Sequence, residues 1–119
     1  VHTVSNRYKD YKKGAERKNI VFGLTEKEFA LIILSGRCFY CDSDVHLNSD
    51  YGNHFAGLDK IEPDNGYIKD NVVLCCQTCN FMKGRDSVSS FIIQCVKISE
   101  NMKKKAKVLV KMLLENKDK

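Results

Sequence analysis

Four cysteines arranged as two Cys-x-x-Cys pairs are the clearest chemical signal in this chain. They are Cys38, Cys41, Cys76 and Cys79. Each pair presents two thiolates from one tight turn, and two pairs are typical of a closed tetrahedral zinc site whose binding energy supplements a small core. Two disulfides would need an oxidising compartment, and a thioredoxin-type redox pair would leave the second pair without a role. The spacing therefore favours a structural Zn²⁺ over these two alternatives.

The other two cysteines are expected outside this zinc site. Cys75 would widen the second pair to three intervening residues, so we expect it at the end of a strand. Cys95 falls on an apolar stripe near the C-terminus, where a buried thiol behaves as a small hydrophobe.

The elements that must position the cysteines are expected to belong to one domain, because 119 residues suffice for one compact core. Three segments are expected: a basic helical segment over residues 1–36, a zinc-bound core over 37–86 and an amphipathic basic helix over 87–119.

Charge is unevenly distributed along the chain. The formal net charge is +5, and both end segments carry an excess of Lys and Arg while the middle segment is acidic. Basic flanks suit a polyanion such as nucleic acid, and an acidic centre repels phosphate unless a cation occupies it. Lysine-rich helices that are simply solvated are the alternative.

Composition also excludes whole classes of protein. Hydrophobic residues make up 43% of the chain, yet no run approaches the roughly 18 apolar residues of a membrane span. We therefore expect neither a membrane partner nor a wholly disordered chain. The lysine-rich composition and the thiols favour an intracellular location, in the cytoplasm or in the host compartment that holds nucleic acid.

The first segment predicts two helices. Apolar and aromatic residues recur at helical spacing between residues 4 and 18, and Lys9, Lys13 and Arg17 form a basic stripe on another face. Thr25 and Glu28 form a capping box before the apolar run 29–34. Gly36 is expected to end that second helix.

The middle segment predicts a β-β-α unit. Short apolar runs alternate with Asn, Asp, Gly and the only proline, which is typical of strands joined by turns. The expected elements are strands over 55–61 and 71–74, a turn over 62–66 and a helix over 77–84.

The last segment predicts one long helix over residues 87–115, capped by Ser87. Apolar residues from Phe91 to Leu113 follow three- and four-residue steps, and a stripe of lysines runs along another face. The apolar face must pack on something, and both the domain core and a second copy of the chain, in a homodimer, remain open.

Three motifs of the middle segment occur in a recognisable order. They are Gly57-Leu58-Asp59-Lys60-Ile61-Glu62, then Gly66-Tyr67 with Asp70-Asn71-Val72-Val73-Leu74, and finally Cys76-x-x-Cys79-Asn80-x-x-Lys83-Gly84. Together they resemble the HNH family of endonucleases, also called ββα-metal or His-Me finger nucleases, and most of all its zinc-stabilised branch. The resemblance covers residues 38–84. It implies an α+β fold in which a zinc-stapled ββα core is flanked by helices.

The resemblance implies hydrolysis of a phosphodiester with one Mg²⁺ or Mn²⁺ ion. It assigns Asp59 and Asn80 as oxygen ligands of that ion, and Asn71 as a structural residue that bridges the turn between the strands. Taken singly, these residues have simpler interpretations as a solvated charge, a helix cap and a turn residue. Their combination around a zinc site favours the metal-binding interpretation.

Lys60 stands where the best-known members have a general-base histidine. A lysine with an ordinary pKa of about 10.4 is protonated at neutral pH, and the neighbouring Asp59 favours the charged form. We therefore expect Lys60 to contact phosphate or to stabilise developing charge. Candidate bases are His54, which would share the strand face of Lys60, then Tyr11, and a metal-bound water assisted by the substrate phosphate. A half-buried strand histidine is the structural alternative for His54.

Contacts with DNA phosphates are expected from two places. Lys83 and Arg85 follow the metal-binding helix closely. On the first helix, Lys9, Lys13 and Arg17 would line the duplex, and Tyr11 is a further expected contact.

The resulting expectation is a metal-dependent DNA endonuclease. Two alternatives remain: a zinc-supported nucleic-acid-binding module without cleavage, which Lys60 motivates, and a protein-interaction adaptor built on the zinc scaffold.

Overall fold

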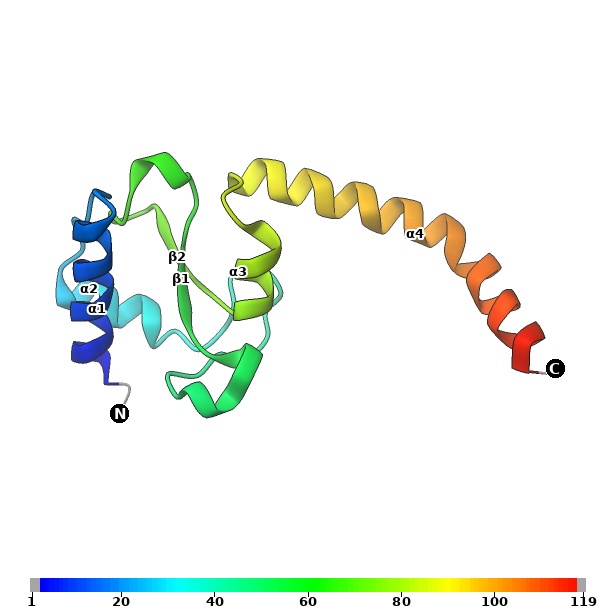
Figure 1. Cartoon of the computed structure of the whole chain (residues 1–119), viewed down its shortest axis with the longest axis horizontal. Helices are drawn as coiled ribbons and strands as arrows, with labels where there is room; N and C mark the ends of the chain where they lie inside the picture. Colours follow the sequence, from blue (N-terminus) through cyan, green and yellow to red (C-terminus); the bar gives the residue numbers. More distant parts are fainter. Residues whose placement is uncertain (1–2, 118–119) are drawn as a thin grey trace. The chain divides into compact units, whose positions relative to one another are not determined.

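The computed structural model describes residues 3–117, which form two compact units that divide after Ser87 (Figure 1). The first unit contains α1 (Val4–Arg17), α2 (Glu26–Ile33), η1 (Ser49–His54), β1 (Gly57–Lys60), η2 (Pro63–Asn65), β2 (Val72–Cys75) and α3 (Gln77–Lys83). The second unit consists of α4 (Val88–Lys117). The expected α+β class is confirmed. Within residues 3–117, no helix combines the length and the apolarity that crossing a lipid bilayer requires.

The sheet has two antiparallel strands, with Gly57 opposite Cys75 and Asp59 opposite Val73. Side chains alternate along a strand, so Leu58 faces the core while Asp59 points to the other face. Figure 1 shows α1 and α2 on one side of the strands and α3 on the other. The core lies on the first side, where Phe29 of α2 is completely buried.

Two side-chain caps begin the N-terminal helices. Thr3 accepts a hydrogen bond from the backbone N–H of Asn6 and caps α1. The expected capping box of α2 is confirmed: Thr25 Oγ1 accepts from Glu28 N at 3.1 Å, and Glu28 Oε1 accepts from Thr25 N at 2.9 Å. Gly36 adopts a φ of 87° but lies two residues beyond the C-cap Leu34, one position later than expected.

The first strand is shorter than the sequence predicts. Residues 49–54 form the 3₁₀ segment η1, which is kinked at Gly52, where φ is 58° and ψ is −120°. Phe55 then makes only an isolated bridge with His46 before β1 begins at Gly57. His54 therefore lies outside the strand, and the expectation that it shares a strand face with Lys60 is wrong.

Asn71 holds the connection between the strands, as expected. Its side-chain oxygen accepts from Glu62 N at 3.0 Å, and its amide nitrogen donates to Glu62 O at 3.0 Å and to Gly66 O at 2.8 Å. These three bonds satisfy both ends of a buried amide, which fixes the strand register at this end.

The long helix α4 extends two residues further than expected, to Lys117. Much of its apolar surface is exposed in the structure of residues 3–117, including Ile98 at 53% and Leu113 at 69%.

Candidate functional site

The four paired cysteines come together as expected. Their Sγ atoms all lie within 4.8 Å of one another, and those of Cys41 and Cys76 are 3.7 Å apart. A tetrahedral zinc ion with Zn–S bonds of about 2.3 Å requires sulfur atoms about 3.8 Å apart. The geometry and the all-sulfur donor set thus fit a metal ion of this kind.

Three different elements meet at this cysteine cluster. The first pair follows α2 and is attached to β2 by the hydrogen bond from Phe39 N to Leu74 O, at 2.8 Å. The second pair begins at Cys76, whose Sγ accepts from Cys79 N and caps α3. An ion bound here would therefore fix the first pair, the end of β2 and the start of α3 relative to one another.

The protein environment shifts the pKa values of three of these thiols in different directions. Hydrogen bonds with Ser43 lower the pKa of Cys41 to about 6, whereas burial raises the pKa of both Cys76 and Cys79. Buried thiols that resist ionisation bind as thiolates only when a cation compensates the charge. Cys75 stays outside the cluster, as expected, and its Sγ donates to Cys76 O at 3.1 Å.

Asp59 lies in a buried polar network rather than in solvent. Its Oδ1 is 3.2 Å from Lys83 Nζ, and its Oδ2 accepts a hydrogen bond from the Tyr40 hydroxyl. Lys83 Nζ also donates to Lys60 O at 3.0 Å. Burial and then the bond to Asp59 raise the pKa of Tyr40 above its usual range, so this phenol remains a proton donor.

Asn80 lies on the same side of the sheet as Asp59. A Cβ placed on Gly57 would be 3.8 Å from Asn80 Nδ2 and 3.7 Å from the Tyr11 hydroxyl. Gly57 and Asp59 are two residues apart, so their side-chain directions share a face. One turn of α3 separates Asn80 from Lys83, which reaches Asp59. The exposed Asn80 amide and the Asp59 carboxylate therefore occupy neighbouring positions along β1 and α3.

The Lys60 ammonium lies over the ring of Tyr67, 5.0 Å from its centroid. Burial, and then the positive charge of Lys18, lower the pKa of Lys60, and they outweigh the opposing effect of Asp59. The direction of this shift differs from the sequence expectation, in which Asp59 was the dominant neighbour. No local sequence pattern indicates Lys18 as a neighbour of Lys60, because it is 42 positions away in the chain and approaches Lys60 only in the folded structure.

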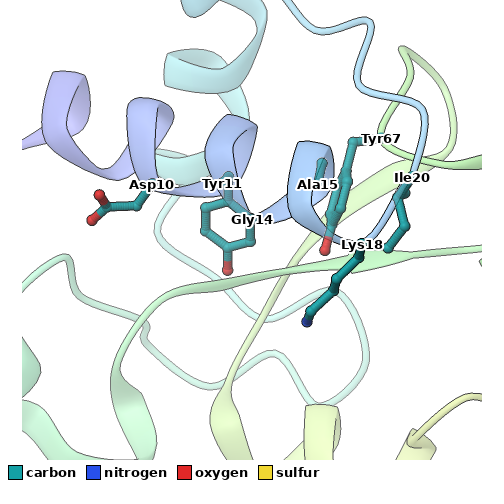
Figure 2. Close-up of a pocket in the computed structure, with 7 residues that line it drawn as sticks. All are labelled: Asp10, Tyr11, Gly14, Ala15, Lys18, Ile20 and Tyr67. Carbon is teal, nitrogen blue, oxygen red and sulfur yellow. The ribbon is translucent and has the colours of Figure 1, made fainter.

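A pocket of about 230 Å³ opens beside this lysine pair, between the end of α1 and Tyr67 (Figure 2). Figure 2 shows the side chains of Tyr11, Lys18 and Tyr67 pointing to the same side of α1. The Tyr11 hydroxyl accepts from Leu58 N at 3.0 Å, so it is anchored to β1 instead of facing outward from the helix. Tyr11 thus belongs to the centre of the site, whereas Arg17 remains on the exposed side of α1.

His54 is exposed on η1, a segment that packs against α3. Its Nδ1 lies 2.9 Å from Asp44 O. A carbonyl oxygen only accepts, so Nδ1 must carry the proton, and Nε2 of the neutral ring is then left with its lone pair. This tautomer suits a general base, although His54 lies on η1 and not on the strand.

Lys83 and Arg85, both expected to contact DNA, have different environments in the structure. Arg85 is exposed, but the Lys83 side chain is only 1% exposed because its ammonium neutralises Asp59. Lys83 is thus unavailable to a phosphate outside the protein. A buried lysine costs free energy unless it is paired, and the sequence did not reveal its partner on a distant strand.

Two further residues were missed by the sequence analysis. Tyr40 lies between Cys38 and Cys41, and no sequence pattern indicates its hydrogen bond to Asp59. Arg7 was not singled out, yet its guanidinium is buried, donates to Ala56 O at 2.7 Å and lies 4.4 Å from the Phe55 ring centroid. Arg7 thereby ties α1 to the chain just before β1. Arg7 and Tyr11 are four residues apart and share one face of α1, and this spacing is the sequence signal that could have indicated a buried Arg7.

The fold is HNH-like. It is similar to the solved structure of PacI, described as a rare-cutting HNH restriction endonuclease with an extraordinary mechanism of DNA perturbation, with a TM-score of 0.62. The similarity covers 83% of this chain and 78% of that chain, at 22% sequence identity.

A curated relative is also similar in sequence. It is the uncharacterized protein R423 of Acanthamoeba polyphaga mimivirus, which is 38% identical over 99 residues. These residues are 83% of this chain but 17% of the relative, so the chain spans about a sixth of that protein's length. No family profile matches the chain.

Proposed function

We propose that this chain is a metal-dependent DNA endonuclease, in which Asp59 and Asn80 hold one Mg²⁺ or Mn²⁺ ion. The observation that carries the proposal is that Asn80 of α3 approaches β1 on the face that carries Asp59, within an HNH-like fold. A carboxylate and an amide oxygen are hard ligands that suit such an ion. When bound, the ion would polarise the phosphoryl group and stabilise the leaving oxygen.

The remaining roles follow from the positions of the side chains. Lys60 and Lys18 form a positive pair beside the site and are proposed to bind the phosphate groups next to the cut. His54 is the proposed base, because its Nε2 is free to accept a proton. Arg17 and Arg85 are proposed to contact the DNA backbone further away.

The cysteine cluster is proposed to hold a structural zinc ion, distinct from the catalytic ion. All-sulfur coordination suits Zn²⁺, whereas Mg²⁺ and Mn²⁺ prefer oxygen ligands. We further propose that residues 1–119 act as one nuclease domain, in an intracellular compartment where the thiols stay reduced.

We also propose that two copies of the chain associate through α4. Its exposed apolar residues include Met102 and Leu109, each 42% exposed. A symmetric dimer would cover both copies of this face and place two sites on one duplex.

A second candidate function is a nucleic-acid-binding module that does not cleave. It is favoured by the engagement of both Asp59 oxygens, by Lys83 and Tyr40, and by Lys60 at the position of the base. A carboxylate has about four lone-pair sites, however, so two bonds still leave room for a metal ion.

A nicking assay on supercoiled plasmid distinguishes the endonuclease from the module that only binds nucleic acid. The zinc-loaded parent is expected to nick the plasmid with Mg²⁺ or Mn²⁺, whereas Asn80→Ala should retain binding on a gel but lose nicking by at least about 100-fold. Asn80 is exposed, so its truncation tests the metal site with little effect on folding. Binding by the parent without any nicking would favour the second candidate. Asp59→Asn and His54→Ala extend the series to the other ligand and the base.

A further inference from the structure

Each of the two carboxylate oxygens of Asp59 accepts a hydrogen bond from a segment that also carries cysteines of the cluster. Tyr40 lies between Cys38 and Cys41 and donates to Oδ2. Lys83 lies at the end of α3, the helix that begins directly after Cys76, and reaches Oδ1 at 3.2 Å. One contact with the carboxylate thus comes from within the first cysteine pair, and the other comes from the helix that contains Cys79.

These contacts fix the orientation of the Asp59 carboxylate. Lys83 Nζ is itself anchored at 3.0 Å on Lys60 O, so its position does not depend on Asp59 alone. The Lys83 side chain is 1% exposed and that of Asp59 is 6% exposed, so little water competes for either group. A carboxylate held at both oxygens in a buried site loses its freedom to rotate about the Cβ–Cγ bond.

Tyr40 lies in a tight turn between the two cysteines of the first pair. Cys38 N donates to Ser43 O at 2.9 Å, and Asp42 N donates to Cys38 O at 3.0 Å, which closes a tight turn around the residue. Asp42, inside this turn, has a φ of 60°, a conformation that few non-glycine residues adopt. An ion bound by Cys38 and Cys41 would hold this turn, and hence the Tyr40 hydroxyl, in place.

We propose that Tyr40 and Lys83 are positioning residues that orient Asp59 for the catalytic ion and make the binding of that ion depend on the cysteine cluster. This inference rests on the proposed function, because it assumes that Asp59 is a metal ligand. Groups that hydrogen-bond a metal ligand commonly change metal affinity by 10- to 100-fold when they are removed.

Removal of one hydroxyl tests the proposal. In zinc-loaded protein, Tyr40→Phe is expected to weaken Mn²⁺ binding about ten-fold, as measured by electron paramagnetic resonance of the free ion. The variant should still contain one zinc per chain and show the circular dichroism spectrum of the parent.

Tyr8→Phe is the matched control. Its hydroxyl also donates to a partly buried acceptor, Leu24 O at 2.7 Å, but this acceptor is not part of the Asp59 network. Tyr8→Phe should leave Mn²⁺ affinity unchanged. If Tyr40→Phe binds Mn²⁺ as tightly as the parent does, or more tightly, Tyr40 is merely structural and the proposal is overturned.

Lys83→Arg provides a second variant in case Tyr40→Phe does not fold. Arginine keeps the charge but cannot reproduce the single-atom contact with both Asp59 Oδ1 and Lys60 O, so Mn²⁺ binding should again weaken while zinc is retained. Unchanged Mn²⁺ affinity in this variant would contradict the proposal.

The parent and Asn80→Ala distinguish this inference from the proposed function. If the parent binds Mn²⁺ and Asn80→Ala weakens that binding while the Tyr40 and Lys83 variants do not, only the positioning role fails. If the parent neither binds Mn²⁺ nor nicks DNA, the proposed function fails and the positioning role fails with it.

Discussion

Asp59 shows how the same residue can be recognised from the sequence while its surroundings are not. Its motif predicts a metal ligand, but the ion pair with Lys83 joins residues 24 positions apart, and no local pattern reports such a contact. The four thiols and Asn71, by contrast, were predictable because tight spacing or a neighbouring turn fixes their partners. Only the structure therefore reveals that the Lys83 ammonium is buried.

The ion pair leads to a prediction about stability. Lys83→Met should lower the free energy of unfolding by about 3–5 kcal/mol, because it leaves the Asp59 carboxylate buried without its cation. Urea unfolding of zinc-loaded protein measures this loss.

Arg85→Ala is the comparison for Lys83→Met. Its side chain is exposed, so we expect a stability change below about 0.5 kcal/mol but weaker DNA binding. A Lys83→Met variant as stable as the parent would show that the buried pair contributes nothing.

Lys60 gives a prediction about pH. Because its pKa is lowered in the folded chain, protonation costs more there than in the unfolded chain. This cost applies at every pH below the folded pKa and disappears as pH rises through that value toward the unfolded pKa of about 10.4. Lys60→Met should thus stabilise the protein slightly at neutral pH, by at most about 0.5 kcal/mol, while weakening DNA binding.

Unfolding curves at neutral and alkaline pH check the sign. The stabilisation produced by Lys60→Met should shrink as pH rises. Lys60→Arg should produce no stabilisation, because arginine retains the charge. A gain that grows with pH would contradict the assigned cause.

At the scale of elements, the sequence predicted the helices well because their caps and apolar periods are local. The α2 capping box is present as predicted, and α1 and α3 end within a residue of the expected positions. The first strand was predicted too long, because the apolar pattern before Gly57 does not reveal the kinked η1 segment. His54 was therefore placed on the wrong element.

The capping box carries a prediction of its own. Thr25→Ala should destabilise the protein by about 1 kcal/mol, whereas Thr25→Ser should restore most of that loss. Hydrogen bonds from Thr25 lower the pKa of Glu28, so its contribution is present above the unfolded pKa of 4.5 and is lost as pH falls through the folded value. The stability difference between Glu28→Ala and the parent should consequently narrow in acid, which thermal unfolding measures.

On the scale of the whole molecule, we expect the stability of the first unit to depend on a metal ion in the cysteine cluster more than on the apolar core. The sheet has only two strands of four residues each, and such a small sheet is marginal without further support. A structural zinc ion contributes on the order of 10 kcal/mol, comparable to the total stability of a domain. The cysteine spacing alone predicts this dependence, and the close approach of the four sulfur atoms supports it.

Removal of zinc should therefore unfold this unit. A strong chelator is expected to abolish its cooperative thermal transition, and acid should release zinc because protons compete for the thiolates. Cys41→Ser should lose zinc readily, whereas Cys95→Ser, outside the cluster, should retain one zinc per chain in atomic emission measurements. Chelation without any loss of structure would argue against a structural ion.

Anomalous X-ray scattering from crystals of the zinc-loaded protein grown with Mn²⁺ tests the central claim most directly. We expect one zinc peak within bonding distance of the four sulfur atoms and a separate manganese peak bonded to the Asp59 carboxylate and the Asn80 amide oxygen. The account would be contradicted if no manganese bound there, or if the ion lay elsewhere with the Asn80 side chain turned away from Asp59.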